Sequence, residues 1–390
     1  MPQSLLHHLL TRLGREGAMT VADFMGEALT HPAAGYYMHG DPFGAPGPVG
    51  GDFVTSPEIS QMFGELIGIW CVDTWVRLGR PDPCLLVELG PGRGTLMADA
   101  LRATRQVPGF HAALQVHLVE ISPALRERQR EALGAHDVTW LDNVGQIPEA
   151  PLLVIANEFF DALPVRQFEQ TGSDGAGDWA ERVVVLADTA KANVGKKDDG
   201  KLAFALAAPS PANRALIPAP LRGAAKGAVV EICPAALNIA AFLGHRLARQ
   251  PGAALIIDYG PAESTPGPTL QALRRHRRHE VLDAPGTADL TAHVDFQSLA
   301  QRAVAAGCAA HGPVAPGAFL TALGIEVRAA QLAESAPAAA TALTAARRRL
   351  TDPAEMGSLF KALALTPREL PPAAGFEPLS PALSSKSEGR

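Results

Sequence analysis

The sequence predicts an α/β protein with a mostly parallel, Rossmann-like sheet whose two faces are covered by helices. From residue 84 onward, short apolar runs alternate with amphipathic helical segments. The runs are apolar throughout, which is typical of parallel strands buried on both faces. Of the 390 residues, 47% are hydrophobic and 19% are charged, so the chain has enough apolar material for a large core and too little charge for a disordered protein.

The N-terminal part predicts helices separated by a long loop. Residues 1–30 have the spacing of two short amphipathic helices. A stretch of Gly, Pro and aromatic residues follows, and structureless segments of that length are more often functional than idle. A strong helix is predicted over residues 57–78, because Ser56 can cap it, Pro57 and Glu58 suit its first turn, and apolar residues recur at helical spacing. Its wide apolar arc makes a homodimer plausible.

The alternating region predicts five strands, with an interruption after the fourth. The interruption, residues 170–225, has polar tips typical of hairpins or disordered loops, and we interpret it as an insertion in the sheet domain. The predicted strands are residues 84–90, 116–122, 138–142, 152–158 and 253–260. Later helices are predicted over residues 295–307, 326–348 and 353–363.

These elements divide the chain into four predicted parts. Residues 1–80 hold the N-terminal helices and a lid, and residues 81–262 form the α/β core with its insertion. Residues 263–370 are expected to complete the sheet and the substrate side of the site. The Pro/Ser-rich residues 371–390 are predicted to be a flexible tail.

Charge and cysteine usage exclude several classes of protein. The chain has 34 Lys and Arg against 40 Asp and Glu, and this net charge of −6 argues against an overall electrostatic hold on nucleic acid. The four cysteines lie far apart without C-x-x-C spacing, so we expect no disulfide framework, no metal site and a reducing, cytoplasmic location. No apolar run approaches the roughly 18–20 residues of a membrane span, and the N-terminus lacks the pattern of a secretory signal.

The first candidate ligand site is a glycine-rich segment that ends the first predicted strand and opens a helix. It reads Glu88-Leu89-Gly90-Pro91-Gly92-Arg93-Gly94. Glycines let the backbone turn sharply and pass close to a ligand. The dinucleotide fingerprint G-x-G-x-x-G would need a glycine where the chain has Thr95. The spacing therefore favours a loop for S-adenosylmethionine (SAM), with Glu88 near the positive end of the ligand.

Polar residues at the ends of the next two strands support a SAM site. Glu120 ends the second predicted strand, where an acid can accept hydrogen bonds from both ribose hydroxyls. Asp142 and Asn143 end the third strand, where a polar side chain can meet the adenine amino group. The alternative is a glycine turn with carboxylates in solvated loops. A nicotinamide cofactor is disfavoured further, because no tyrosine stands in a Y-x-x-x-K pair.

The segment after the fourth strand is placed for the chemistry. In an open parallel sheet the reaction centre lies outside the carboxyl ends of the strands, so Asn157, Glu158 and Asp161 are candidate catalytic residues on the acceptor side. Asn157 and Phe160 have the spacing of the N-P-P-Y loop of amino-group methyltransferases. Glu158 could orient a cationic acceptor such as an arginine guanidinium, which has five donors in a fork. Alternatively, Glu158 is an acid at a helix N-terminus that binds backbone N–H groups.

Further candidates lie on the predicted lid and beyond the core. The glycine- and aromatic-rich segment could close over the site, or its aromatic rings could be core plugs. Its candidate residues are Tyr36, Tyr37, Asp52, Phe53 and Glu58. His293 could be a base or a core histidine. The basic run of residues 274–279 could steer an acidic partner, although charge runs are more often solvated surface.

Several long stretches carry a resemblance to a known family. They extend from about residue 15 to residue 365 and include GYYMHGDPFG, GDFVTSPEISQMFGELIGIW, LVELGPGRGTLMADALR, HLVEISPALRERQ, ANEFFDALPVRQF and ALIIDYG. With these stretches the chain resembles the MidA-like SAM-dependent methyltransferases, bacterial relatives of the mitochondrial complex I assembly-factor arginine methyltransferase. Extra small residues before G-D-F depart from the family pattern and leave the shape of the lid open.

The resemblance implies a class I methyltransferase fold and a SAM cofactor. For the mitochondrial relative it implies symmetric dimethylation of an arginine in a complex I subunit. By position, the SAM loop of the family falls on Gly90, Gly92 and Gly94, its ribose acid on Glu120, and its substrate-side N-E-x-x-D segment on Asn157, Glu158 and Asp161.

The leading hypothesis is a cytoplasmic SAM-dependent methyltransferase that acts on an arginine of a protein substrate. A complex I subunit is the candidate partner by resemblance. Two alternatives stay open: methylation of a small amine or guanidine metabolite, and an assembly chaperone that binds SAM without essential catalysis.

Overall fold

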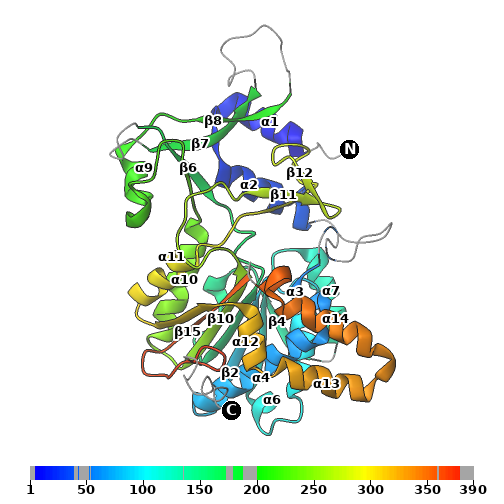
Figure 1. Ribbon diagram of the computed structural model, residues 1–390. Coiled ribbons are helices and arrows are strands. Elements are labelled where there is room, and N and C mark those ends of the chain that lie inside the picture. Colours follow the sequence, from blue (N-terminus) through cyan, green and yellow to red (C-terminus); the bar gives the residue numbers. More distant parts are fainter. Residues whose placement is uncertain are drawn as a thin grey trace, which may run out of the picture.

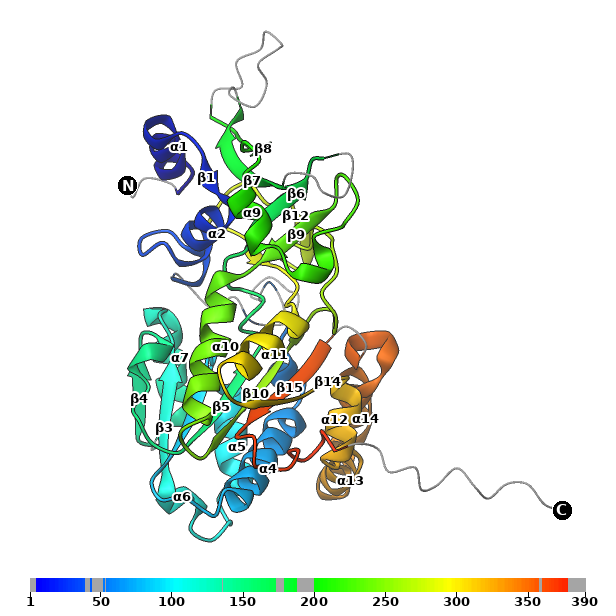
Figure 2. The same cartoon turned by 90° about the vertical axis from the view of Figure 1, so that its left-hand side faces the viewer.

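The structure is a computed structural model whose described part consists of two bodies, one above the other in Figure 1. The lower body is built on a large sheet with helices on both faces. The upper body holds a smaller sheet and the two N-terminal helices (Figure 2). The described residues are 5–38, 43, 52, 54–134, 136–172, 179–187, 200–357 and 360–377.

The large sheet confirms the predicted α/β fold and all five predicted strands. Its strand order is β14-β15-β10-β5-β2-β3-β4, and the five strands from β10 to β4 are parallel. The two further strands, β15 and β14, pair antiparallel at one edge. The strands are β2 (Cys84–Leu89), β3 (Leu114–Val119), β4 (Val138–Leu141), β5 (Leu152–Asn157), β10 (Gly252–Tyr259), β14 (Ala309–Val314) and β15 (Phe360–Thr366).

Both faces of this sheet are buried, which explains why its strands are apolar throughout. On one face, Leu86 and Ile155 belong to a core with α4 (Gln61–Arg77), α5 (Thr95–Thr104), α12 (Pro316–Ala322), α13 (Ile325–Ser335) and α14 (Ala340–Thr351). On the other, Val87 and Val154 belong to a core with α10 (Pro234–Leu247) and α11 (Phe296–Ala305). Alternate residues thus face opposite cores, as parallel sheets of this kind require. Two further helices, α6 (Phe110–Ala113) and α7 (Pro123–Leu133), flank β3 along the chain.

The upper body differs from the predicted insertion in the sheet domain. The described strands between residues 166 and 232 form, together with the N-terminal β1, an antiparallel sheet that is separate from the large one, in the order β1-β7-β6-β9 with β8 on β7. The N-terminal strand β1 joins this sheet, so the start of the chain and the insertion fold together. The elements are α1 (Leu5–Glu16), β1 (Met19–Thr20), α2 (Val21–Thr30), β6 (Arg166–Gln170), β7 (Trp179–Leu186), β8 (Leu202–Leu206), α9 (Pro211–Leu216) and β9 (Val229–Ile232).

A small three-stranded sheet lies against the N-terminal helices. It consists of β11 (Gln271–Arg274), β12 (Arg277–His279) and β13 (Asp289–Thr291), in the order β12-β11-β13. Ala272 and Leu290 of this sheet share one apolar core with Leu9 of α1 and Phe24 of α2. Residues 263–291 therefore belong with the upper body, whereas α11 and the strands that follow belong with the lower one.

Three predicted helices differ from the structure. The helix predicted over 57–78 is divided into α3 (Ser56–Ile59) and α4, because Ser60 is extended and its hydroxyl caps α4. The helix predicted over 326–348 is likewise divided into α13 and α14 near Pro337. The helix predicted over 353–363 is correct only at its start, where η5 (Pro353–Gly357) is a short π-helix, and wrong at its end, since residues 360–366 form β15. A short apolar run has no decisive period, and pairing with β10 determines its structure here.

The predicted tail also needs a correction. Ala373 is fully buried, and the ring of Phe376 lies 5.2 Å from that of Phe319, so residues 371–377 pack onto the lower body. The rest of the predicted tail, residues 378–390, lies outside the described residues. None of the helices in the described ranges has the length and hydropathy of a membrane span. All four cysteines are free.

Candidate active site

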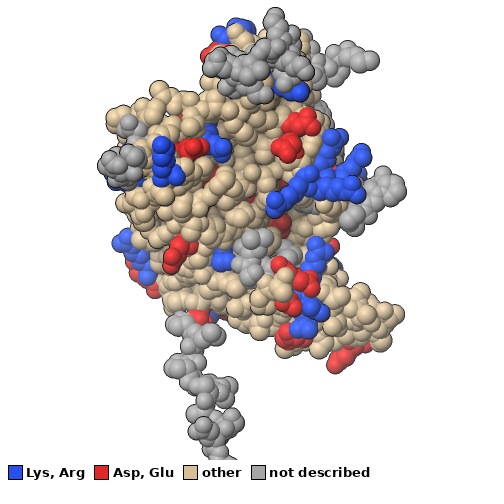
Figure 3. Space-filling view, turned by 45° about the horizontal axis from the view of Figure 1, so that its top comes forward, with Lys and Arg blue, Asp and Glu red and all other residues tan. Residues whose placement is uncertain are grey.

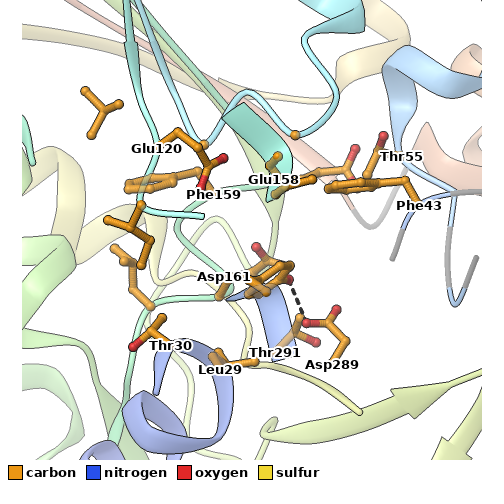
Figure 4. A pocket seen from close by; sticks show the side chains of 18 of the residues that line it. Leu29, Thr30, Phe43, Thr55, Glu120, Glu158, Phe159, Asp161, Asp289 and Thr291 are labelled. Carbon is orange, nitrogen blue, oxygen red and sulfur yellow. Dashed lines mark hydrogen bonds between the residues drawn. The ribbon is translucent and has the colours of Figure 1, made fainter. Parts of the chain in front are cut away.

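A cavity of about 450 Å³ lies between the two bodies, a volume typical of small-molecule sites. Its lower wall is formed by the carboxyl ends of β2, β3 and β5. Its upper wall comes from α2, β11 and β13 (Figure 4). The predicted site residues that line it are Tyr37, Gly90, Gly92, Glu120, Asp142, Asn143, Glu158 and Asp161. Residues far apart in the sequence are thus brought to one space at the edge where parallel strands end.

The glycine loop, residues 88–94, has a backbone that only glycine adopts easily. Gly90, Gly92 and Gly94 have φ values of 61°, 54° and 83°. A Cβ on Gly90 would lie 2.7 Å from the ring of Phe159, and one on Gly92 would lie 3.0 Å from the ring of Phe43. Larger residues would therefore strain the turn and fill the space beside it. Gly94 does not line the cavity but caps α5.

Two buried polar atoms beside the loop have no partner among the described residues. They are Oε2 of Glu88 and Oδ1 of Asn157, and both side chains border a small cavity of about 40 Å³ next to the loop. Burial raises the pKa of Glu88 to about 8. Buried polar groups are normally paired, so these two atoms are suited to hydrogen-bonding donors of a ligand. This is the feature of the structure that most directly fits a cationic cofactor.

Glu120 is held in place at the end of β3. It accepts hydrogen bonds from the backbone N–H of Ser122 at 2.8 Å and from Nε2 of Gln129 at 3.2 Å. The same Nε2 also donates to the carbonyl of Gly92 at 2.7 Å, so Gln129 ties the acid to the glycine loop. Burial raises the pKa of Glu120, although these hydrogen bonds oppose the shift. Sequence reasoning missed Gln129, which is buried inside an otherwise polar helix.

Asp142 and Asn143 line the same cavity after β4. Asp142 is exposed and pairs with Arg126 at 2.6 Å. The Asn143 side chain accepts a hydrogen bond from the backbone N–H of Gly145 and caps a short 3₁₀ turn, η2 (Val144–Gln146). Both residues therefore keep polar atoms at the end of the cavity where the sequence predicts an adenine contact.

Glu158 directly follows β5 and lines the large cavity near Phe159 and Thr55 (Figure 4), and it also borders the small cavity beside the glycine loop. Its φ of 50° is unusual for a residue with a side chain, and such strain is found mostly at functional sites. One carboxylate oxygen accepts hydrogen bonds from the Ser56 backbone N–H at 2.8 Å and from Nδ2 of Asn157 at 3.2 Å. Burial raises the pKa of Glu158.

Asp258, at the end of β10, fixes the turn that carries Glu158. One of its oxygens accepts hydrogen bonds from the backbone N–H groups of Phe159, Phe160 and Asp161 at 3.1, 2.9 and 3.3 Å. Asp258 is fully buried, and burial raises its pKa to about 7. Sequence reasoning missed this residue; the signal was a single acid in an otherwise apolar strand.

A second acidic group faces the cavity from the upper wall. Asp289 begins β13 and accepts a hydrogen bond from the Tyr37 hydroxyl at 2.7 Å (Figure 4). Burial raises its pKa to about 7. Asp161 lines the same space, and its pKa is raised by burial and by the nearby Asp258 and Asp289. Glu158, Asp161 and Asp289 thus bring three carboxyl groups to one part of the cavity, where each can ionise when a cation comes to lie beside it. Asp289 was not predicted.

The predicted lid residues lie around the cavity in different roles. Tyr37 lines it, whereas Tyr36 is buried and donates to Asp52 at 2.8 Å. Glu58 borders the small cavity and accepts hydrogen bonds from Arg93 and Thr95. Phe53 lies outside the described residues.

His293, predicted as a substrate-side residue, is not among the residues that line this cavity. It follows the end of β13 and lines a separate cavity of about 70 Å³ with Cys233 and Phe160. Its ring packs edge-on against Tyr259, and burial lowers its pKa. The core alternative is therefore the one that the structure supports.

The sheet order and the site together define a class I SAM-dependent methyltransferase. The glycine loop follows the central strand β2, an acid ends the neighbouring β3, and the chain order reverses between β2 and β5, where ligands of open α/β sheets bind. A family model described as "Putative S-adenosyl-L-methionine-dependent methyltransferase" matches residues 66–314. The chain belongs to this family.

Relatives and solved structures agree with this assignment. The mitochondrial protein arginine methyltransferase NDUFAF7 of Mus musculus is 39% identical, with 94% of this chain and 85% of the relative covered. Its Homo sapiens counterpart is 36% identical, with 94% and 84% covered. A Burkholderia thailandensis protein bound to S-adenosyl-homocysteine superposes with a TM-score of 0.80 at 31% identity, with 95% and 93% covered. SAM is therefore the cofactor.

The names of the curated relatives correct one expectation. The Mus musculus, Danio rerio and Homo sapiens proteins are all named as mitochondrial. The cytoplasmic location predicted from the cysteine usage is therefore wrong as an inference for this family. Free cysteines distinguish reducing from oxidising compartments, but they do not distinguish among reducing ones.

Proposed function

We propose that this methyltransferase transfers a methyl group to a guanidinium nitrogen of an arginine in a protein substrate. The observation that carries the proposal is the position of Glu158, a half-buried carboxylate that lines the large cavity and also borders the small cavity beside the glycine loop. The carboxyl groups of this cavity have raised pKa values because they are buried, and a cationic acceptor beside them would favour their ionised form and pair with it. The names of the curated relatives, protein arginine methyltransferases, support the same acceptor.

The residues at the lower wall are those that we expect to hold SAM. The glycine loop lets the cofactor approach the backbone, and Glu120 is placed to accept from ribose hydroxyls. Asp142 and Asn143 would contact the adenine. The unpaired oxygen of Glu88 would accept from the positively charged amino group.

Glu158 would act on the acceptor in two ways. When bound, SAM supplies an electrophilic methyl group on its sulfonium. A guanidinium keeps its proton in proteins and presents parallel N–H donors, so a carboxylate can orient it and direct one nitrogen toward the methyl. The reacting nitrogen must then lose a proton, and the raised pKa of Glu158 makes this carboxylate a better acceptor than an exposed one. Alignment of the two reactants accounts for most of the gain.

The narrower identity of the protein substrate rests on the family resemblance. A subunit of respiratory complex I is the candidate that it supplies.

A homodimer stays a prediction. The apolar arc of α4, on which that prediction was based, supports it less, because most of this arc is buried within the chain. Only Ile69 and Val76 of that helix are among the exposed large hydrophobic residues.

Two other functions remain to be separated from this one. A small guanidine or amine metabolite would fit the same acidic cavity. A SAM-binding assembly chaperone would need the fold and the cofactor but not the acceptor chemistry. The strained backbone of Glu158 favours catalysis, since a purely structural ligand site has no need of it.

A labelling experiment tests the proposal. The purified protein is incubated with SAM labelled in the methyl group and with an extract of cells that lack this protein, divided into macromolecules and small molecules. We expect the label in the macromolecules, and as methylarginine after acid hydrolysis. Label in the small-molecule fraction, or in another amino acid, would overturn the protein-arginine proposal. No transfer at all, with SAM bound, would favour the chaperone.

A further inference from the structure

The hairpin formed by β11 and β12 is a basic, exposed surface that the site does not explain. It presents Arg274, Arg275, Arg277 and Arg278 within five consecutive positions, and all four side chains are exposed. Figure 3 shows them as a continuous block of blue at the right-hand side of the molecule. Within the described ranges, none of the four guanidinium groups forms an ion pair with a carboxylate.

The register of the hairpin places like charges opposite each other. Arg274 is the direct cross-strand partner of Arg277, and Arg278 is opposite Leu273. Like charges in directly opposed positions destabilise a strand pair. Glu280 and Asp283 follow the hairpin, but Asp283 pairs with His279 instead. The arginines therefore concentrate positive charge on a surface where an anionic partner would relieve the repulsion.

The turn that joins the two strands is held rigidly. Arg275 and His276 have φ values of 50° and 60°, a conformation that residues with side chains adopt at a cost. Asp52 holds this turn, because its side chain accepts from the Arg275 N–H at 2.6 Å and its carbonyl accepts from the His276 N–H at 3.0 Å. The Tyr36 hydroxyl binds the other oxygen of Asp52. The arginines are thus presented from a fixed support beside the lid.

The same hairpin is also a wall of the active site. Gln271 and Leu273 line the large cavity, and Leu273 precedes the first arginine directly. Anything that reaches into the acidic cavity from this side must pass close to the basic turn. The cavity offers carboxyl groups that can pair with a cation, and the turn offers guanidinium groups that can pair with an anion. Together they suit a ligand that is cationic at the reacting point and anionic beside it.

We propose that the β11–β12 hairpin is a docking surface for an acidic segment of the protein substrate, next to the residue to be methylated. This inference rests on the proposed function for the choice of partner.

RNA and anionic membranes fit this hairpin less well than an acidic peptide segment does. Single-stranded RNA is bound through aromatic stacking platforms, and residues 271–279 contain no Phe, Tyr or Trp. Peripheral membrane binding uses apolar anchors, which the hairpin also lacks.

The test uses a probe whose binding does not depend on catalysis. A fluorescein-labelled peptide of alternating Glu and Ser, without arginine, is titrated with the full-length protein in the presence of S-adenosyl-homocysteine. We expect Arg277→Glu/Arg278→Glu to weaken binding about tenfold, and Arg277→Gln/Arg278→Gln to weaken it less. Raising the salt from about 50 mM to about 300 mM should weaken wild-type binding, because exposed charges are screened.

The matched control reverses the charge of two exposed arginines near the end of the large sheet where its parallel strands begin, opposite the end that lines the cavity. Arg105 ends α5 and Arg249 follows α10, so Arg105→Glu/Arg249→Glu makes the same change in net charge far from the cavity. We expect this variant to bind the peptide within about twofold of wild type. All variants should bind S-adenosyl-homocysteine as wild type does, which shows that they are folded.

Three results would overturn the proposal. They are peptide binding that the hairpin variants leave unchanged, equal loss in the hairpin and control variants, and tighter binding of oligouridine or phosphatidylserine vesicles through the same arginines. If the peptide binds as expected but no methylarginine forms in the labelling experiment, the proposed function fails and the docking surface stands.

Discussion

At the scale of single residues, the site depends on a few buried carboxylates whose charge is disfavoured by their surroundings. Glu88 is the clearest case, because its Oε2 has no partner in the described part of the chain and its pKa is raised to about 8. A cation that enters beside it would restore the ionised form. Cofactor binding and proton release should therefore be coupled at this residue.

We predict that S-adenosyl-homocysteine binds more tightly as the pH rises from about 6.5 to about 8, by about fivefold per pH unit, and that binding releases a proton. Below its pKa, Glu88 must lose a proton before it can pair with the ligand's amino group. Glu88→Gln should remove both effects. Calorimetry in buffers of different ionisation enthalpy counts the protons. Glu127 is an exposed acid on α7, and Glu127→Gln serves as the control. A pH dependence of binding that survives in Glu88→Gln would contradict the assignment to Glu88.

At the scale of elements, the turn after β5 is held by a neighbouring strand. Three consecutive backbone N–H groups point at one oxygen of Asp258 on β10, and β10 pairs with β5 along its length. The strained backbone of Glu158 is thus fixed from outside its own segment. This arrangement explains how a residue with a positive φ can be held in a defined position.

We predict that Asp258→Ala lowers the free energy of unfolding by about 3 kcal/mol, because it leaves buried backbone donors without an acceptor. It should also impair methyl transfer more than cofactor binding, since the turn carries Glu158. Urea denaturation measures the first effect. Asp73→Asn removes an acid that pairs with Arg77 on the surface of α4, and we expect a loss of less than about 1 kcal/mol there. Equal losses in the two variants would refute the special position of Asp258.

Prediction from sequence worked best where one physical signal dominated. Continuously apolar runs identified the five parallel strands, and Gly90, Gly92 and Glu120, which were predicted to share one site, line the same cavity. Residues 360–366 were misassigned because a short apolar run suits either a helix or an edge strand, and only pairing with β10 decides. Asp258 and Asp289 were missed because their roles come from contacts with residues far away in the sequence.

At the scale of the whole molecule, the site is a contact between two bodies. The lower body supplies the strand ends that we propose hold the cofactor, and the upper body closes the cavity with α2, β11 and β13. The buried acids at this contact, Glu88, Asp258 and Asp289, have raised pKa values of about 8, 7 and 7. Folding therefore buries carboxyl groups that prefer to be neutral.

We predict that the protein without ligand becomes less stable as the pH rises from about 5 to about 8. In this window the folded state holds protons on these acids until the pH reaches their raised pKa values, whereas the unfolded chain, with ordinary values near pH 4, has already lost them. The folded state binds more protons, so rising pH lowers the free energy of unfolding. The midpoint of thermal unfolding should fall, and less steeply in Glu88→Gln. A midpoint that rises across this window would contradict the predicted sign.

The central claim is that Glu158 acts on the acceptor and not on the cofactor, and one pair of measurements on Glu158→Gln tests it. This substitution keeps an oxygen for the Ser56 N–H and removes the charge. We predict that formation of labelled methylarginine falls about 100-fold or more, while the affinity for S-adenosyl-homocysteine changes by less than about threefold. A transfer rate close to that of wild type, or a loss of affinity as large as the loss of rate, would contradict the claim.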